Sequence, residues 1–278
     1  MTVAGVPGSG KSTFLSEMRR DFVDLNKDQE FEILSFEFEM RMEDQLARDV
    51  SAKSGMAMKD IYSASEALDD EKYKDICSKL EEVSALPIFY VDKIGTSIDI
   101  RNTIITFVQN RKLKEDGKGL VVTIDHTLLT KGKSGDAEKQ RVDELYTMLV
   151  ELKKHYSYEQ FPVMFVVLSQ LNRDIQSSER VTNPKLHYPT QNDLFASSSA
   201  YQSSDYVVIM HRPSALSGMG MFYGPAREGF PNGLPVLCPT IEGKSMVYLH
   251  VIKERFGSPK IISCVENFAV NQITEYTF

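Results

Sequence analysis

One short segment near the start of the chain constrains the fold more than any other part of the sequence. Residues 5–12 read Gly-Val-Pro-Gly-Ser-Gly-Lys-Ser, which fits the pattern G-x-x-x-x-G-K-[ST]. The β-prone residues 2–4 precede this segment, and a helical pattern opens at residues 13–15. A glycine-rich turn between a strand and a helix is the context in which this pattern binds phosphate groups. The segment therefore predicts a strand, a phosphate loop and a helix at the start of the fold.

The loop supplies several groups that suit a nucleoside triphosphate and its metal ion. Its glycines let the backbone wrap with N–H groups pointing inward, and the helix N-terminus adds a positive dipole. We expect Lys11 to neutralise charge on the β- and γ-phosphates and Ser12 to offer its hydroxyl to Mg²⁺. The residues predicted to contact the nucleotide, ATP, are Gly5, Pro7, Gly8, Ser9, Gly10, Lys11, Ser12 and Thr13.

Apolar runs alternate with polar, helix-length stretches along the chain. Strand-like runs lie at residues 2–4, 33–38, 88–91, 119–124, 163–168, 206–210, 246–252 and 261–265. Amphipathic stretches that suit helices lie at residues 12–24, 42–53, 67–83, 98–114 and 137–155. This alternation is typical of a parallel sheet flanked by helices. We therefore predict an α/β fold with a mostly parallel, twisted sheet, helices on both faces and a C-terminal antiparallel strand pair.

The length and composition fit one globular domain. The chain has 278 residues, of which 42% are hydrophobic and 26% charged, so it can form a sizeable core. Residues 214–243 contain six glycines and four prolines, which predicts a long irregular loop or hairpin. Because apolar strands resume after this stretch, we interpret it as an insert within a single domain over residues 1–278.

Two predicted strands end in side chains that suit nucleotide chemistry. Asp125 directly follows an apolar strand, and a carboxylate at this position suits Mg²⁺ held through water, together with Ser12. Gln170 ends another strand, where its neutral amide could hydrogen-bond the γ-phosphate or the attacking water without competing for the metal. The sequence therefore predicts a metal-binding carboxylate at the end of one strand and, at the end of another, an amide suited to contact the γ-phosphate or its water.

A third candidate lies in the predicted strand after the first helix, where residues 36–40 read Phe-Glu-Phe-Glu-Met. Strand alternation puts both phenylalanines on one face and both glutamates on the other. Glu39 lies nearer the carboxyl end of the strand, so it is the candidate base for the attacking water. We expect Glu37 to be solvated or paired with a helix.

The charge balance limits the possible partners. The formal net charge is −7, so no broad positive field attracts nucleic acid or acidic lipid. Any nucleic-acid contact must come from a local patch, and the basic candidates in two loops after strands are Lys131, Lys133, Arg173, Arg180 and Lys185. The longest apolar stretch, residues 163–168, is far shorter than the ~20 residues of a membrane span. Since a strand follows Met1 at once, no signal peptide is expected, and we predict a cytoplasmic protein with no membrane partner.

These pieces, in this order, resemble the RecA-type motor domain of hexameric replicative helicases of the DnaB family over nearly the whole chain. Residues 36–40 resemble the family's Phe-Ser-Leu-Glu-Met, and residues 120–129 resemble its Walker B strand. Residues 168–173 match the family's Leu-Ser-Gln-Leu-Asn-Arg. The resemblance implies a RecA-like P-loop fold, in which Glu39 activates water and Gln170 senses the γ-phosphate.

The resemblance also implies a catalytic role for the end of the seventh predicted strand. Residues 252–257, Ile-Lys-Glu-Arg-Phe-Gly, resemble the family's Lys-Gln-Arg-Asn-Gly, whose lysine and arginine reach into the neighbouring subunit's nucleotide. Lys253 and Arg255 would take these roles, and a guanidinium inserted across an interface stabilises charge on the transferred phosphoryl group. Without the resemblance, the segment reads as a charged turn.

Two departures from the family bear on its partners. Where the family carries Asp-Leu-Arg-Glu-Ser-Gly-Ser in a loop that touches single-stranded DNA, residues 193–199 read Asp-Leu-Phe-Ala-Ser-Ser-Ser. Backbone amides and serine hydroxyls remain for DNA contact, and Phe195 could stack on a base or pack in the core. The chain also starts at the first strand, so we expect it to lack the family's N-terminal domain and linker helix, either as a fragment or as a stand-alone motor.

The prediction from sequence is an ATP- and Mg²⁺-dependent motor of a replicative DNA helicase, of phage or bacterial origin. Hydrolysis at subunit interfaces would move single-stranded DNA through a ring, expected to be hexameric, with primase and loader proteins as further candidate partners. Two alternatives stay open. One is a P-loop kinase or a RecA-like ATPase that does not unwind DNA, and the other is a helicase-loader or assembly module.

Overall fold

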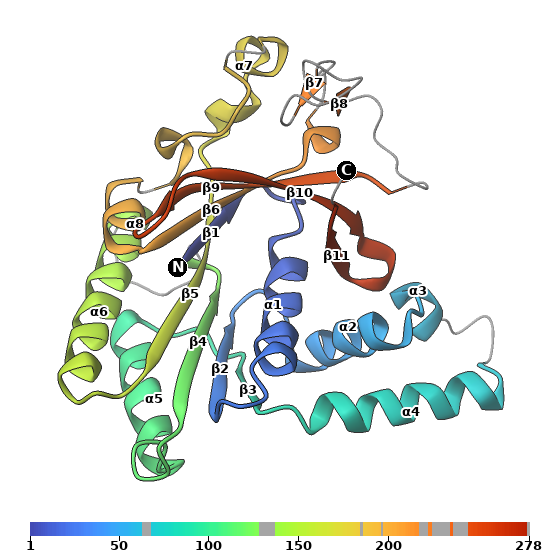
Figure 1. Cartoon of the computed structure of the whole chain (residues 1–278), viewed down its shortest axis with the longest axis vertical. Helices are drawn as coiled ribbons and strands as arrows, with labels where there is room; N and C mark the ends of the chain where they lie inside the picture. Colours follow the sequence, from blue (N-terminus) through green and yellow to red (C-terminus); the bar gives the residue numbers. More distant parts are fainter. Residues whose placement is uncertain are drawn as a thin grey trace.

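A nine-stranded mixed sheet lies at the centre of the structure, in the strand order β11-β10-β9-β6-β1-β5-β4-β2-β3 (Figure 1). The computed structural model describes residues 1–62, 68–127, 137–183, 186–195, 197–216, 222–223, 234–235 and 244–276. Six strands run parallel to one another: β1 (Thr2–Gly5), β2 (Phe31–Glu37), β3 (Ile88–Val91), β4 (Gly119–Asp125), β5 (Val163–Gln170) and β6 (Tyr206–His211). Three antiparallel strands follow at one edge: β9 (Met246–Glu254), β10 (Lys260–Asn267) and β11 (Gln272–Glu275).

The predicted fold class is confirmed, and so are all eight predicted strands. Each strand lies within two residues of its expected ends. Short β11 was not predicted, because its four residues contain one apolar side chain, Ile273, and so carry no strand-like pattern. The expected antiparallel pair at the C-terminal end is therefore part of a three-stranded antiparallel edge.

Eight α-helices are present among the described residues. They are α1 (Lys11–Leu25), α2 (Met42–Ser54), α3 (Met58–Ile61), α4 (Asp70–Ser84), α5 (Ser97–Asn110), α6 (Glu138–Tyr158), α7 (Ser178–Thr182) and α8 (Ser197–Ser203). The five predicted helices are among them. The prediction extended α5 to residue 114, but the helix ends at Asn110, because Lys112 and Gly117 adopt positive φ angles in the turns that follow.

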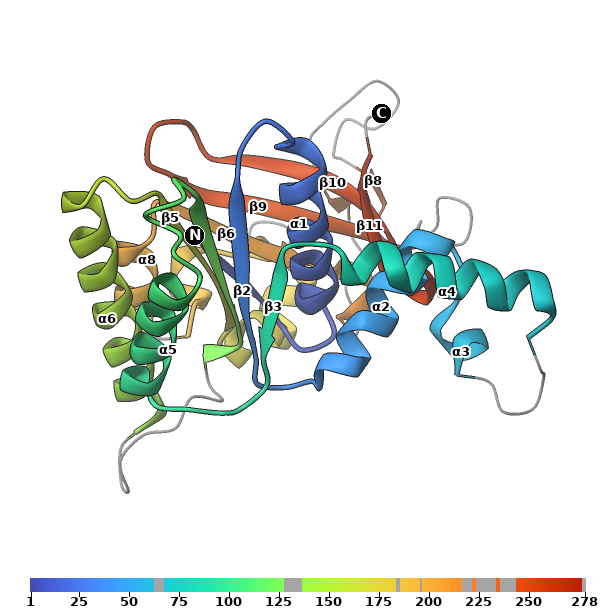
Figure 2. The same cartoon turned by 90° about the horizontal axis from the view of Figure 1, so that it is seen from below.

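Helices cover both faces of the sheet, as the alternation within β5 shows. Phe165 and Val167 pack in a core with α5 and α6, whereas Val166 and Leu168 pack in a second core with α1. Figures 1 and 2 show α5 and α6 on one side of the sheet and α1 on the other, with α4 lying against α2 beyond the β3 edge. This sandwich leaves the two ends of the strands open to carry loops.

The described part of the predicted insert agrees with a hairpin. The short strands β7 (Phe222–Tyr223) and β8 (Leu234–Pro235) pair antiparallel in a separate two-stranded sheet. Most of the remaining insert lies outside the described residues.

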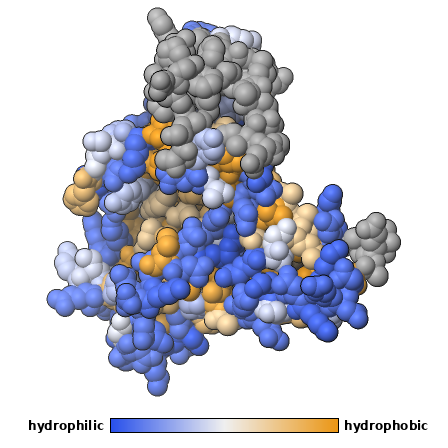
Figure 3. Space-filling model, turned by 45° about the vertical axis from the view of Figure 1, so that its right-hand side comes forward, coloured by the Kyte–Doolittle hydropathy of each residue, from blue (hydrophilic) through white to orange (hydrophobic). Residues whose placement is uncertain are grey.

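The surface seen in Figure 3 is largely hydrophilic, with hydrophobic side chains in separate patches. Exposed apolar residues such as Leu25, Tyr158 and Phe256 lie on different elements. In the part of the chain that the structure describes, every helix is too short or too polar to span a lipid bilayer.

Candidate functional site

The predicted phosphate loop joins β1 to α1 at the carboxyl ends of the parallel strands. Gly8 and Gly10 have φ angles of 75° and 94°, in the left-handed region that favours glycine. Gly10 is the N-cap of α1, and the backbone N–H of Phe14 donates to its carbonyl at 2.9 Å. The loop therefore exposes the N-terminus of a 15-residue helix, where backbone N–H groups and the helix dipole favour an anion.

Lys11 lies folded over this loop. Its Nζ donates hydrogen bonds to the carbonyls of Gly5 at 2.8 Å and Val6 at 3.0 Å. Burial lowers the pKa of Lys11 to about 8, although the nearby carboxylates of Asp125 and Glu39 raise it. The ammonium therefore lies within electrostatic reach of both predicted acidic residues and can exchange its carbonyl contacts for phosphate oxygens.

Two other predicted loop residues, Thr13 and Ser9, differ in what their hydroxyl groups contact. The hydroxyl of Thr13 donates to Oδ1 of Asn271 at 2.9 Å, which ties α1 to the C-terminal segment. The Oγ atom of Ser9 is buried and has no hydrogen-bond partner among the described residues. Ser9 thus offers a free hydroxyl inside the loop, whereas Thr13 can contact a nucleotide through its backbone N–H.

Asp125 ends β4 and faces Ser12 at the start of α1. Burial raises the pKa of Asp125 to about 6, the charge of Glu37 raises it further, and a hydrogen bond with the Ser12 side chain opposes the shift. Within the described ranges, Oδ1 of Asp125 is buried without a hydrogen-bond partner. A hydroxyl and a carboxylate with an unshared oxygen are the hard oxygen donors that Mg²⁺ takes, so these two residues fit that ion.

Glu39 lies in a bend after β2, so the expectation that it shares a strand with Glu37 is wrong. Sheet pairing ends where the N–H of Phe38 donates to the carbonyl of Asp125 at 2.8 Å, and the chain then turns toward α2. The Glu39 side chain is 57% exposed, and Oε2 lies 3.7 Å from Nε2 of His126. The bend frees this carboxylate from the sheet and leaves it at the mouth of the site.

Glu37, the last residue of β2, is buried. Its carboxylate accepts hydrogen bonds from Arg19 on α1, from Ser35 at 2.6 Å and from Gln45 on α2 at 2.8 Å. Both charged side chains of the Arg19–Glu37 ion pair are 1% exposed. Pairing with a helix, one of the two expectations for Glu37, is therefore confirmed, and the network fixes α1 and α2 to the end of β2.

Gln170 ends β5 directly beside the phosphate loop, since it pairs in register with Gly5. Its Nε2 lies 3.5 Å from Nε2 of His126, which in turn faces Glu39. Burial lowers the pKa of His126, and the charge of Glu39 opposes the shift, so the ring is neutral near pH 7. Sequence reasoning gave His126 no role, yet it lies between the two predicted residues that would contact water and the γ-phosphate.

Two further residues beside the loop carry no sequence signal. Arg212 follows β6, and its Nη1 donates to the carbonyl of Gly8 at 3.4 Å. Its guanidinium lies 4.8 Å from the ring centroid of Phe268 and pairs with Glu266 at 3.1 Å. The Phe268 ring in turn covers Gly10, where an added Cβ would come within 2.5 Å of it. An aromatic ring and a guanidinium therefore flank the loop, a pair that suits a planar base.

Lys253 and Arg255 do not join this group. β9 runs antiparallel to β6, so Glu254 pairs with Tyr206 at the amino end of β6, while the phosphate loop follows the carboxyl ends of the strands. At about 3.3 Å per residue, a strand the length of β6 separates the two ends by roughly 20 Å. The two cations therefore lie at the opposite end of the sheet from the nucleotide site of their own chain.

The loop candidates for nucleic-acid contact are only partly described. Arg180 forms an ion pair with Asp193 and donates to the carbonyls of Leu186 and Tyr188, both at 3.0 Å, so it braces its own loop. Arg173 is exposed, and Phe195 packs partly buried against the core of α5 and α6. The remaining basic candidates, Lys131, Lys133 and Lys185, lie outside the described residues.

The fold and the site define a P-loop nucleotide-binding protein of the RecA-like class. Comparison with known families then gives a direct match, because the DnaB-like helicase C-terminal domain family covers residues 1–264. The chain belongs to this family.

Individual relatives agree with that assignment. The chain is 29% identical over 182 residues to a replicative DNA helicase DnaB of Mycobacterium leprae, covering 65% of this chain and 27% of that protein. It is 28% identical over 215 residues to the replicative DNA helicase DnaB of Leifsonia xyli, covering 77% of this chain and 42% of that protein. The chain thus spans less than half the length of these relatives.

Solved structures show the same fold. One that is described as an ATPase domain superimposes with a TM-score of 0.75 at 20% identity, covering 99% of this chain and 84% of that chain. A DnaB-like replicative helicase, described with its interactions with primase, gives a TM-score of 0.74 at 20% identity, covering 98% of this chain and 56% of that chain.

Proposed function

We propose that this chain is the Mg²⁺-dependent ATPase motor of a replicative DNA helicase, with active sites shared between neighbouring subunits of a ring. The observation that carries the proposal is the separation within the chain. Lys11 and Asp125 lie at one end of the parallel strands, whereas Lys253 and Arg255 lie at the other. With this arrangement, Lys253 and Arg255 would reach a nucleotide on a neighbouring subunit and not the one on their own chain, which supports the proposal, and relatives of the chain are named replicative DNA helicases.

The phosphate-loop end would bind ATP. Backbone N–H groups of the loop and Lys11 contact the phosphates, while Phe268 and Arg212 enclose the base. Ser12 and Asp125 would hold Mg²⁺, which when bound neutralises charge on the β- and γ-phosphates. These residues bind and orient the nucleotide before any bond changes.

Glu39 would orient and deprotonate the attacking water. It is exposed at the mouth of the site, and the neutral ring of His126 stands between it and Gln170. Gln170 then donates from its amide to the γ-phosphate, so the loss of that phosphate changes its hydrogen bonding. Arg255 and Lys253 of the neighbouring subunit stabilise the charge that develops on the transferred phosphoryl group.

Single-stranded DNA would be contacted by residues 193–199, which are tied to the nucleotide site. The backbone N–H of Phe195 donates to the carbonyl of Gln170 at 3.1 Å, and Leu194 bridges Leu171. A change at Gln170 therefore reaches the DNA segment through the backbone. Because Phe195 packs toward the core and the Ser199 hydroxyl donates to Asp143, we propose contact through backbone amides and the other serine hydroxyls of the segment. By similarity to the helicase studied with primase, primase is a candidate partner.

The test is ATP hydrolysis over a series of protein concentrations, with and without single-stranded DNA. We expect the rate per subunit to climb with concentration, as assembly completes the sites, and to rise further with DNA. Lys11→Ala and Arg255→Ala should each abolish turnover alone. A mixture of the two variants should regain activity, because an interface between them can combine one intact phosphate loop with one intact Arg255.

The other outcomes separate the alternatives. Turnover that ignores concentration, DNA and Arg255 would indicate a self-contained P-loop enzyme such as a kinase. A small-molecule kinase would usually need an arginine-bearing lid, and the loop from Arg173 to Arg180 is the candidate for one; Arg180 is engaged with Asp193 there, whereas Arg173 is exposed. Assembly with ATP but no response to DNA would indicate an assembly or loader module.

A further inference from the structure

The two cations at the end of β9 contact one short segment, residues 201–205, which comprises the last residues of α8 and the link to β6. Nζ of Lys253 donates to the carbonyl of Tyr201 at 2.5 Å and to that of Gln202 at 3.4 Å. It also lies 4.8 Å from the ring centroid of Tyr201. Carbonyls at a helix C-terminus attract cations, so the end of α8 holds Lys253 in place.

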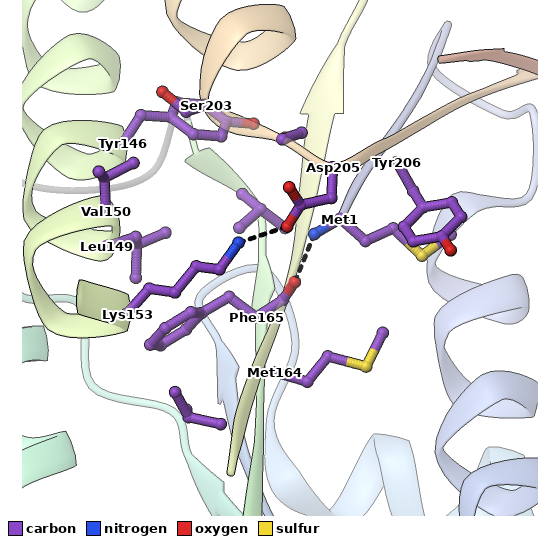
Figure 4. Close-up of a pocket in the computed structure, with 13 residues that line it drawn as sticks. Met1, Tyr146, Leu149, Val150, Lys153, Met164, Phe165, Ser203, Asp205 and Tyr206 are labelled. Carbon is purple, nitrogen blue, oxygen red and sulfur yellow. Dashed lines mark hydrogen bonds and ion pairs between the residues drawn. The ribbon is translucent and has the colours of Figure 1, made fainter. Parts of the chain in front are cut away.

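Asp205 holds Arg255 by two contacts. Nε of Arg255 lies 2.7 Å from Oδ1 of Asp205, and the backbone N–H of Arg255 donates to the carbonyl of Asp205 at 3.0 Å. Asp205 is itself anchored by an ion pair with Lys153 on α6, whose side chain reaches toward it in Figure 4. Burial raises the pKa of Asp205, but Lys153 and Arg255 outweigh it, so the carboxylate is charged well below neutral pH.

These contacts orient Arg255 without enclosing it. The carboxylate takes the inner nitrogen, Nε, while the side chain remains 50% exposed. With Nε engaged, the two terminal nitrogens form the edge of the guanidinium that can bind a phosphate in bidentate fashion. The register of β9 against β6 shifts by one residue just before Lys253. Such a β-bulge changes the direction of the side chains beside it, here those that lead to Arg255.

We propose that Asp205 is a positioning residue for catalysis across the subunit interface. It fixes the inner edge of the Arg255 guanidinium, so that the outer edge enters the nucleotide site of the neighbouring subunit already oriented. The inference rests on the proposed function, because it requires Arg255 to act in a neighbour's site. It predicts that loss of Asp205 impairs catalysis at the interface that contains Arg255. Nucleotide binding to the chain's own phosphate loop, at the far end of the sheet, should not change.

The first measurement separates turnover from binding. Asp205→Asn should lower kcat of the assembled protein about tenfold or more, because an unheld arginine loses its orientation. The affinity of each chain for a fluorescent ATP analogue should not change. Glu159→Gln is the matched control: it also removes a partly exposed carboxylate paired with a lysine, Lys114, and it should leave both values unchanged.

The second measurement assigns the defect to one side of the interface. Lys11→Ala lacks a working phosphate loop but keeps Asp205 and Arg255. Mixed with Asp205→Asn, it should restore turnover well above that of either variant alone. Arg255→Ala mixed with Lys11→Ala is the reference mixture.

Each result gives a decision. If the reference mixture regains activity but Asp205→Asn alone matches the unmodified protein, the positioning role is wrong and the shared site stands. If the reference mixture stays inactive, the proposed function fails, and the inference fails with it. If Asp205→Asn does not bind nucleotide, Asp205→Glu, which keeps the charge, replaces it in both measurements, with a smaller loss expected and full kcat overturning the proposal.

Discussion

Two arginine–carboxylate pairs at opposite ends of the strands differ in their surroundings. Arg19 on α1 and Glu37 at the carboxyl end of β2 are each 1% exposed and belong to a network with Ser35 and Gln45. Arg255 and Asp205, at the far end, are 50% and 28% exposed, and Arg255 is bound through one inner nitrogen. Arg19 is enclosed by residues of its own chain, whereas the outer edge of the Arg255 guanidinium is open to another molecule.

The difference in burial distinguishes a pair that stabilises the fold from a pair that can act in catalysis. A buried pair resists loss of either partner, because the remaining charge would be left in a medium of low polarity. An exposed pair adds little to folding but can present a charge in a fixed direction. The comparison therefore predicts that substitutions in the buried Arg19–Glu37 pair act on stability, while substitutions of the exposed site residues Glu39 and Arg255 act on turnover.

The largest expected effect is on turnover, from Glu39→Gln. An exposed carboxylate at the mouth of the site can be replaced without loss of folding, but loss of a general base lowers kcat about 10²- to 10⁴-fold. The ATPase rate should therefore fall, while the nucleotide affinity and the thermal midpoint of unfolding should not change. Glu37→Gln, two residues earlier, is the matched control and should mainly lower stability. Full turnover by Glu39→Gln would remove Glu39 from the mechanism.

The next effect is on folding, from Arg19→Met. Removing the guanidinium leaves Glu37 buried without its counter-ion, which should cost about 3–5 kcal/mol of unfolding free energy. Urea unfolding followed by circular dichroism measures it. Lys114→Met, which breaks a half-exposed ion pair with Glu159, should cost no more than about 1 kcal/mol. Equal losses from the two variants would contradict the distinction between buried and exposed pairs.

The sequence predicted the parts of the site that are contiguous in the chain. The loop from Gly5 to Thr13 and the strand ending at Asp125 each carry their own pattern, and the structure places them together. Arg212 and Phe268 could not be predicted, because they are 56 residues apart and meet only through the pairing of β6, β9 and β10. No local spacing encodes that contact.

The prediction that Glu39 lies in the same strand as Glu37 was wrong for a related reason. Alternation of apolar and polar residues continues from Phe36 to Met40, but a strand lasts only as long as its neighbours can pair with it. The neighbouring strand β4 ends at Asp125, which pairs with Glu37. The end of β2 is thus set by a strand about 90 residues later in the chain, which the local pattern does not report.

A smaller expected effect is a pH dependence of ATP affinity that arises at the phosphate-loop end of the sheet and not at the Arg255 end. Burial lowers the pKa of Lys11 to about 8, whereas bound phosphates favour the charged amine, so nucleotide binding takes up a proton. Affinity for ATP should therefore weaken above pH 8, by at most about tenfold per pH unit. Titrations from pH 7 to 9.5 measure this dependence. Arg255→Ala, altered at the far end of the sheet, should keep the same pH profile, and a flat profile for the unmodified chain would show that Lys11 is charged throughout.

The smallest expected effect is that of Arg255→Ala on folding. Half of the Arg255 side chain faces solvent, and an exposed ion pair contributes about 0.2–1 kcal/mol because solvent screens it and ordering the side chain costs entropy. Loss of the partner also leaves Asp205 paired with Lys153, so no buried charge is abandoned. Urea unfolding of Arg255→Ala at low protein concentration, where chains are separate, should therefore resemble that of the unmodified protein. A loss near that of Arg19→Met would assign Arg255 to the support of its own chain, and the functional contrast between the two ends of the sheet would fail.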